Sequence, residues 1–191
     1  AAAPFAASSP ALASEEFARV RESFVFAARL AVDAGFDALE VHVGHGYLLS
    51  QFLSPYNNRR RDGYGGSIEN RSRLLRELIE DTKEAVGHKA AVAVRFAVDE
   101  LIGPQGITVE NEGREVIGLM AELPDLWDGN ISYVENDSQT ARFAEEGYEE
   151  RYTAFVKKLT SKPVVGVGRF TSPDAMVSQV KRGVLDFIGA A

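Results

Sequence analysis

The sequence alternates amphipathic helices with short apolar strands, and this order limits the fold more than any other feature. Phe17, Val20 and Phe24 recur at helical spacing, Gly35 ends that run, and the β-branched segment 38–43 follows it. The same order repeats along the chain. The predicted helices lie at about 15–35, 67–87, 112–123, 148–159 and 172–183, and the predicted strands at 38–43, 90–96, 126–132, 163–168 and 185–188.

Strands that are joined through helices lie parallel, because each connection crosses over the sheet with a right hand. Doubly wound sheets and (β/α) barrels both satisfy this rule. The longer and more polar loops follow the strands, which favours the barrel. An eight-stranded barrel typically takes about 250 residues, whereas this chain has 191 and stops just after a predicted strand. We therefore expect an α/β fold that is part of a TIM (β/α)8 barrel.

Composition narrows the class of protein. With 45% hydrophobic and 26% charged residues, the chain can build a sizeable core. The formal net charge of −7 argues against non-specific nucleic-acid binding, and the longest apolar runs are too short for a membrane span. The chain has no cysteine, so thiolate metal sites and iron–sulfur ligation lie outside it. We expect a cytoplasmic protein with a loop at 1–14, at the edge of the piece, and barrel from 15 to 191.

The most informative motif is His-x-x-His-Gly-Tyr at the end of the first predicted strand. His42, His45 and Tyr47 place three proton-carrying side chains at one strand end, and ligands bind at the carboxyl ends of parallel strands. Histidine changes charge near neutral pH, and both residue types can donate to a developing anion. The motif predicts an acid–base or substrate-binding site. Structural histidines at a loop edge are the alternative, and the spacing does not favour a metal site.

From about residue 15 to residue 191 the sequence resembles the Old Yellow Enzyme family, which consists of flavin-mononucleotide (FMN) oxidoreductases on a TIM barrel. The resemblance rests on motifs at His42 to Leu48, Gln51 to Pro55, Arg61 to Arg71, Val94 to Phe96, Gly166 to Phe170 and Ile188 to Ala191. It implies that the chain covers strands four to eight of the barrel. In this family the paired side chains hold a substrate carbonyl over the flavin, and the tyrosine delivers a proton. His42 and His45 would then be substrate ligands, with Tyr47 as the acid.

Other segments are similar to the trimethylamine and dimethylamine dehydrogenase branch of the family. They are Arg95 to Asp99, Asp125 to Asp128 and Lys162 to Thr171. Those enzymes oxidise N-methylated amines and pass electrons to an iron–sulfur cluster beyond the barrel. The resemblance therefore implies hydride transfer from a small amine, with any such cluster in a part that follows this chain. Since His42 stands where that branch has tyrosine, an ene-reductase that takes hydride from NAD(P)H is the alternative enzyme. A half-barrel that only binds is the alternative of another class.

The resemblance also suggests which residues hold FMN. Arg95 lies within a buried apolar strand and is expected beside the flavin ring, with a barrel-interior ion pair as the plainer reading. The phosphate site is expected at two adjacent strand ends, where small residues let backbone N–H groups approach and the helix start at Ser172 adds its dipole. A tight strand–helix turn without a ligand is the alternative. The residues expected there are Gly166, Gly168, Arg169, Gly189 and Ala190.

Three residues of the strand 126–132 complete the expected site. Trp127 would form an aromatic wall that can hold an ammonium group by cation–π attraction. Asp128 and Asn130 would lie at the strand rim and support the histidines. The expected partners are a small-molecule substrate and, in the intact enzyme, an electron-acceptor protein or further copies of the chain.

Overall fold

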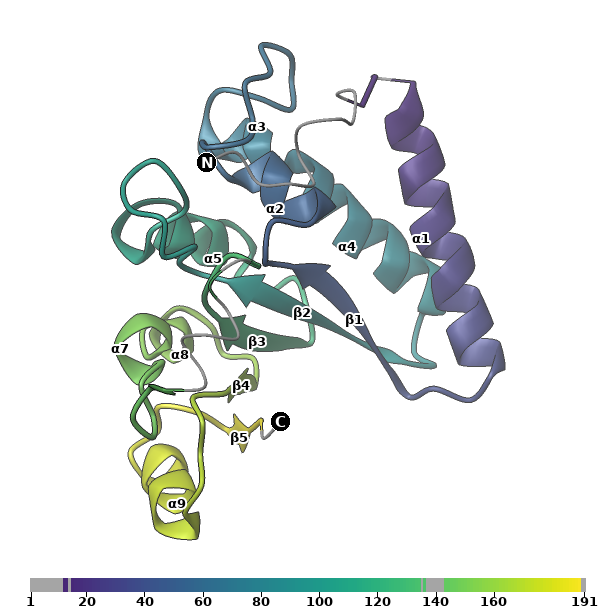
Figure 1. Ribbon diagram of the computed structural model, residues 1–191. Helices are drawn as coiled ribbons and strands as arrows, with labels where there is room; N and C mark the ends of the chain where they lie inside the picture. Colours follow the sequence, from purple (N-terminus) through teal and green to yellow (C-terminus); the bar gives the residue numbers. More distant parts are fainter. Residues whose placement is uncertain (1–11, 14, 135, 137–142, 190–191) are drawn as a thin grey trace.

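The computed structural model describes residues 12–13, 15–134, 136 and 143–189 (Figure 1). Its centre is one sheet of parallel strands in the order β1-β2-β3-β4-β5. The strands are β1 (Ala38–Val43), β2 (Ala91–Ala97), β3 (Leu126–Asn130), β4 (Val164–Gly166) and β5 (Phe187–Ile188). Each strand pairs with the next one in the chain and the order never reverses, as in a barrel and unlike a doubly wound sheet. The expected partial (β/α) barrel is confirmed.

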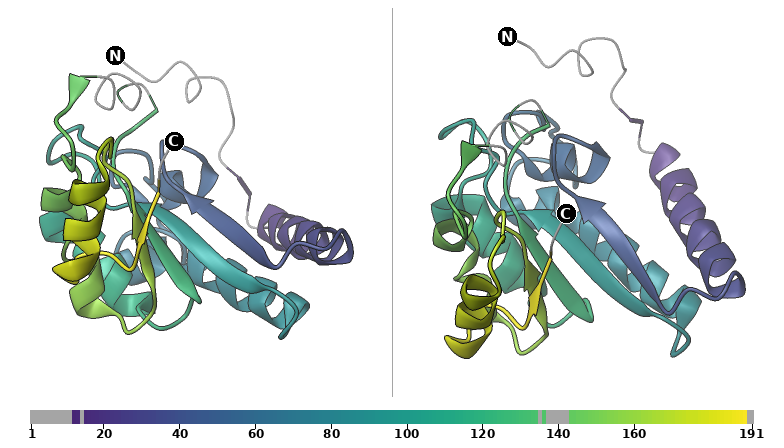
Figure 2. Two further views of the ribbon diagram at one scale, coloured as in Figure 1. Left: turned by 90° about the horizontal axis from the view of Figure 1, so that it is seen from below. Right: turned by 60° about the horizontal axis from the view of Figure 1, so that its bottom comes forward.

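Right-handed crossovers in this order place the helices on one side of the sheet (Figure 2). The principal helices are α1 (Glu16–Asp33), α4 (Arg73–Val86), α5 (Arg114–Met120) and α9 (Pro173–Lys181). Shorter helices are α2 (Leu48–Leu53), α3 (Ile68–Arg71), α7 (Glu150–Thr153) and α8 (Val156–Leu159). None of these helices combines the length and the apolar character that crossing a bilayer requires.

Strand side chains alternate between the helix layer and an inner face. In β1, Val41 and Val43 are buried against the helices, whereas Glu40 is exposed and His42 is half-buried on the inner face. The core therefore lies between the sheet and its helices. It contains Val92, Val94 and Phe96 from β2 and Leu74, Leu75, Leu78 and Ile79 from α4, among others.

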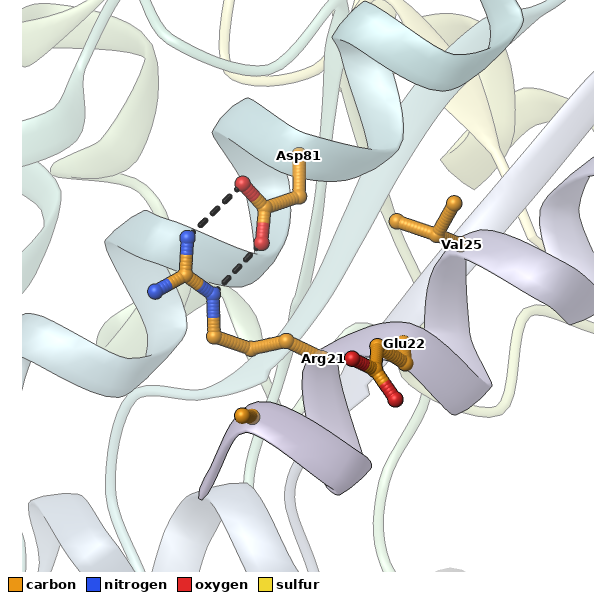
Figure 3. A pocket seen from close by; sticks show the side chains of 5 residues that line it. Arg21, Glu22, Val25 and Asp81 are labelled. Carbon is orange, nitrogen blue, oxygen red and sulfur yellow. Dashed lines mark hydrogen bonds and ion pairs between the residues drawn. The ribbon is translucent and has the colours of Figure 1, made fainter. Parts of the chain in front are cut away.

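Helix α1 is fixed to α4 by a charged contact on the outer surface. Arg21 donates to both carboxylate oxygens of Asp81, from Nε at 2.5 Å and from Nη2 at 2.9 Å, and its Nη1 lies 3.3 Å from Glu77 Oε2. A shallow hollow of about 270 Å³ borders this contact (Figure 3). It lies on the helix side and is separate from the strand ends.

Local signals set several boundaries as predicted. The strand at 38–43 is confirmed to the residue. Ser67 accepts a hydrogen bond from the Asn70 backbone N–H and caps α3, and Ser172 caps α9 in the same way at Ala175, with Pro173 in the first turn. Gly87, with a φ of 56°, ends α4.

Other boundaries differ from the prediction. The helix expected at 112–123 is a π-helical turn at Val109–Gly113 followed by α5, and Gly113 is needed there because a Cβ would lie 2.4 Å from the Val98 carbonyl oxygen. The helix expected at 67–87 is divided at Ser72 into α3 and α4, and the helix expected at 148–159 is divided into α7 and α8. Helix α2 was not predicted, because its apolar run is too short to show helical periodicity.

Candidate active site at the strand ends

Three rings gather where β1 ends. The His42 and His45 rings are stacked with centroids 5.2 Å apart, and the Tyr47 ring meets His42 edge-on at 5.5 Å. The chain reverses sharply between them, since His45 has a φ of 56° and Gly46 a φ of 76°. The Tyr47 N–H then donates to the Gly44 carbonyl at 3.1 Å, and α2 begins. The structure thus brings together the three side chains that the sequence singled out.

The two imidazoles share one contact. Nδ1 of His45 lies 3.3 Å from Nε2 of His42. One of these nitrogens must donate and the other accept, which two doubly protonated rings cannot do. Burial lowers the pKa of His42 below its usual 6.5, and the neighbouring His45 and the Arg95 guanidinium lower it further. His42 is therefore neutral at pH 7 and presents both a donor and an acceptor nitrogen.

A polar row crosses the sheet beside these rings. His42 of β1 is in register with Arg95 of β2, which is in register with Asp128 of β3. Arg95 Nη1 donates to Asp128 Oδ2 at 3.0 Å, with 31% of the Arg95 side chain exposed and 6% of the Asp128 side chain exposed. The barrel-interior ion pair considered for Arg95 is present, and part of the guanidinium still faces the open inner side.

Burial raises the pKa of Asp128 to about 6. The Arg95 guanidinium opposes this rise, and the Glu40 carboxyl, on the same inner face, adds to it. Asn130 lies on this face as well, in register with Ala97 and 3% exposed, and its side-chain oxygen accepts from the Ile131 N–H at 2.6 Å. The structure therefore places Asp128 in the row to which His42 belongs, and Asn130 on the same face two residues further along β3, in the row of Ala97.

Trp127 does not reach this site, which corrects the expectation of an aromatic wall. It alternates with Asp128 along β3 and therefore points into the helix layer, where it is fully buried. Its Nε1 donates to the Ala121 carbonyl at 2.9 Å, just beyond α5. The indole supports the core and cannot contact a ligand on the inner face.

The segment after β4 has the local geometry expected of a close-approach loop. Gly168 has a φ of 153° and Arg169 a φ of 54°, and Arg169 Nη1 donates to the Ala144 carbonyl at 3.0 Å. Gly166 is small for a different reason, since a Cβ there would lie 2.8 Å from Leu185 Cδ2. The Gly189 N–H donates to the Gly166 carbonyl at 2.9 Å, so it is used within the sheet. Ala190 lies outside the described residues.

The start of α9 differs from the expected phosphate site. The Glu146 carboxylate accepts from the backbone N–H of Thr171 at 2.5 Å and from that of Ser172 at 2.6 Å, and it also accepts from the Ser172 hydroxyl. These hydrogen bonds hold the pKa of Glu146 below its usual range. An acidic side chain of this chain thus occupies the helix start that was expected to add its dipole to a phosphate.

Sequence reasoning missed Tyr133, which follows β3 and is 3% exposed. Its ring packs against the turn that carries His45 and Tyr47, so closely that a Cβ on Gly46 would lie 2.4 Å from Tyr133 Cζ. The Tyr133 N–H donates to the Asn136 side-chain oxygen at 2.9 Å. The sequence indicated only a polar loop here, and Gly46 was the one sign that another group approaches the turn.

Comparison with known proteins relates this site to flavin enzymes. The sequence is 39% identical over 180 residues to dimethylamine dehydrogenase of Hyphomicrobium sp. (strain x), a match that covers 93% of this chain and 24% of that protein. It is 34% identical to an NADH oxidase of Thermoanaerobacter brockii, with 93% of this chain and 27% of that protein covered. The chain thus spans about a quarter of the length of these relatives.

Solved structures give the same result. The fold superposes on 6-hydroxypseudooxynicotine amine oxidase of Pseudomonas geniculata N1 with a TM-score of 0.90 and 52% identity, over 94% of this chain and 27% of that one. Histamine dehydrogenase of Rhizobium sp. 4-9 follows with a TM-score of 0.89 and 47% identity, over 96% and 27%. The match to the family profile extends over residues 5–191. This chain therefore belongs to the NADH:flavin oxidoreductase / NADH oxidase family.

Proposed function

We propose that the intact protein is an FMN-dependent oxidoreductase that transfers hydride between the flavin and a small organic substrate, with an amine as the favoured substrate class. The observation that carries this proposal is the row His42–Arg95–Asp128 on the inner face, with His45 and Tyr47 directly above it at the end of β1. Proton-carrying groups and a cation thus meet at one strand end, as flavin chemistry requires.

The donor set on the inner face fits a flavin. A guanidinium carries five N–H donors, and the ion pair with Asp128 uses Nη1, so Arg95 can also face the part of the ring that gains negative charge on reduction. Gly168 and Arg169 offer small size and positive charge for the phosphate. Glu146 already occupies the start of α9, so we assign the phosphate to the loop after β4 rather than to the helix end. When bound, FMN supplies the hydride-accepting centre.

An amine substrate suits the histidine pair. An amine gives up hydride from its α-carbon only when its nitrogen lone pair is free, so the ammonium form must first lose a proton. Neutral His42 can accept that proton or hold the N–H in a hydrogen bond, and Tyr47, 58% exposed, can contact the substrate from the rim. The similarity to two amine-oxidising enzymes at 47% and 52% identity supports this class.

An ene-reductase is the second candidate, and the His-x-x-His pair favours it. A neutral imidazole also donates an N–H, so two adjacent rings can hold a carbonyl oxygen. The sequence is 35% identical over 157 residues to an NADPH dehydrogenase of Clostridium acetobutylicum. In such an enzyme NAD(P)H would reduce the flavin, and an activated alkene would reoxidise it.

Anaerobic stopped-flow measurements on the intact FMN-loaded protein separate the two candidates. We expect that dimethylamine or a larger secondary amine bleaches the flavin absorbance, and that NADPH does not. Bleaching by NADPH followed by reoxidation with cyclohexenone would show the ene-reductase instead. A protein that retains no FMN, or whose flavin responds to neither reductant, would overturn the proposed function. Any iron–sulfur cluster or electron-acceptor partner belongs to the intact protein and is tested there by its own absorbance.

A further inference from the structure

Only one of the two carboxylate oxygens of Asp128 accepts a hydrogen bond within the described part of the chain. Its Oδ2 accepts from Arg95 at 3.0 Å, whereas its Oδ1 is buried and receives no hydrogen bond from any residue in the described part of the chain. Only 4% of the residue is exposed, so water cannot readily take the place of a donor. A buried carboxylate oxygen without a donor is unfavourable. The site therefore calls for a proton or a further partner at Asp128.

Glu40 is the side chain that can provide this partner for Asp128. It lies two residues before His42 on β1, so its side chain is on the same inner face, and its carboxyl raises the pKa of Asp128. Two ionised carboxylates are acceptors only, so a hydrogen bond between them requires that one of them carries a proton.

We propose that Glu40 and Asp128 form a carboxyl pair that shares one proton, and that Arg95 transmits the charge of this pair to the flavin. The second half of this proposal rests on the proposed function, whereas the first half does not. With one proton the pair carries a charge of −1, which the Arg95 guanidinium balances. Without it the pair carries −2 and the cluster is anionic. Glu40 and Asp128 are thus positioning residues that act through Arg95.

The other groups around the pair leave this assignment intact. His42 is the remaining titratable side chain in the row, and β4 and β5 contribute the apolar residues Val165 and Phe187 at the same register. Burial and the Glu40 carboxyl both raise the pKa of Asp128, to about 6. Loss of the shared proton above that pH adds negative charge beside Arg95. The reduced flavin, which is itself anionic, then becomes less stable and the midpoint potential falls.

Infrared spectroscopy tests the pair without any reaction. In the intact protein we expect a carbonyl-stretch band of a protonated carboxylic acid that is lost as the pH rises through about 6. Glu40→Gln and Asp128→Asn should each remove this band, because one proton needs both partners. Glu22→Gln, on the outer face of α1, is the matched control and should leave the band in place. A band that survives in Glu40→Gln would overturn the shared proton.

Potentiometry tests the link to the flavin. A plot of the midpoint potential against pH should change slope near pH 6 in the wild-type protein and lose that change in either single variant. Since His42 is present in all three proteins, the difference between them isolates the pair. Identical plots would refute the coupling through Arg95. If the protein retains no FMN, the proposed function fails, and the infrared band still decides whether the pair exists.

Discussion

The Tyr133 ring packs directly against Gly46, in the turn that carries His45 and Tyr47. A Cβ on Gly46 would lie 2.4 Å from Tyr133 Cζ and 2.7 Å from its hydroxyl oxygen. Gly46 also has a φ of 76°, a conformation that side chains disfavour. The position of two proposed catalytic groups thus depends on a residue from the loop after β3.

Gly46→Ala should therefore distort the site as well as the backbone. Left-handed backbone costs an alanine about 1–2 kcal/mol, and the clash with Tyr133 adds about 1–3 kcal/mol. Gly35→Ala is the matched control, because Gly35 has a φ of 90° but no atom within 4 Å of its Cβ position. Thermal unfolding of the intact protein should show the larger loss for Gly46→Ala, together with lower kcat. Equal losses of thermal stability in the two variants would mean that the Tyr133 ring moves aside at no cost.

Activity should fall on the acidic side through the ionisation of His42. The pKa of His42 is lowered from 6.5, so the substrate-accepting neutral form is lost only below that value. A plot of kcat/KM against pH should therefore be flat near neutrality and decline at a pH below 6.5. His42→Asn should remove this limb of the profile. An unchanged limb in that variant would assign the ionisation to another group.

The same pKa shift has a consequence for stability. Since the folded pKa lies below the unfolded value, the unfolded chain binds more protons in the window between the two. The free energy of unfolding should therefore decrease as the pH falls from 6.5 through the folded pKa, and the loss is complete below it. Denaturant titrations at several pH values give the free energy of unfolding. Its dependence on pH in that window should be steeper for the wild-type protein than for His42→Asn. The same dependence on pH in both proteins would refute the shift.

Replacing Arg95 should harm both the ion pair and cofactor retention. Arg95→Met leaves the buried Asp128 carboxylate without its donor, which costs about 1–3 kcal/mol. Arg95→Lys keeps a charge but offers a single donor atom, so it should retain more FMN than Arg95→Met. Flavin fluorescence after gel filtration measures this retention. Full retention of FMN by Arg95→Met would place the flavin away from the guanidinium.

Trp127→Phe tests the correction to the expected site. The indole lies in the helix layer and donates to the Ala121 carbonyl, so its loss should lower stability by about 1–3 kcal/mol. The KM for an amine should stay within about twofold of wild type, because Trp127 makes no contact on the inner face. Loss of a real substrate contact, even one of methylene size, would cost at least about 1 kcal/mol and change KM by more than this. A large rise in KM without a loss of stability would return Trp127 to the substrate site.

The sequence by itself determined the order of the elements, the edges of β1 and the residue types at its end. Helical and strand periodicities, the serine caps at Ser67 and Ser172 and the glycine at Gly87 are local signals, and the chain folds locally as they dictate. The motif from His42 to Tyr47 was also legible, because three proton-carrying residues at one strand end need no distant partner to be noticed.

Only the tertiary structure decided which side chains meet. β3 is buried on both faces, so its sequence does not reveal that Trp127 enters the helix layer while Asp128 faces inward. The register with β2 settles this, and it depends on residues 33 positions away. Glu40 beside Asp128, Tyr133 beneath Gly46 and Glu146 at the start of α9 join segments from different loops and strands. Such contacts arise from packing and register, which local periodicity does not encode.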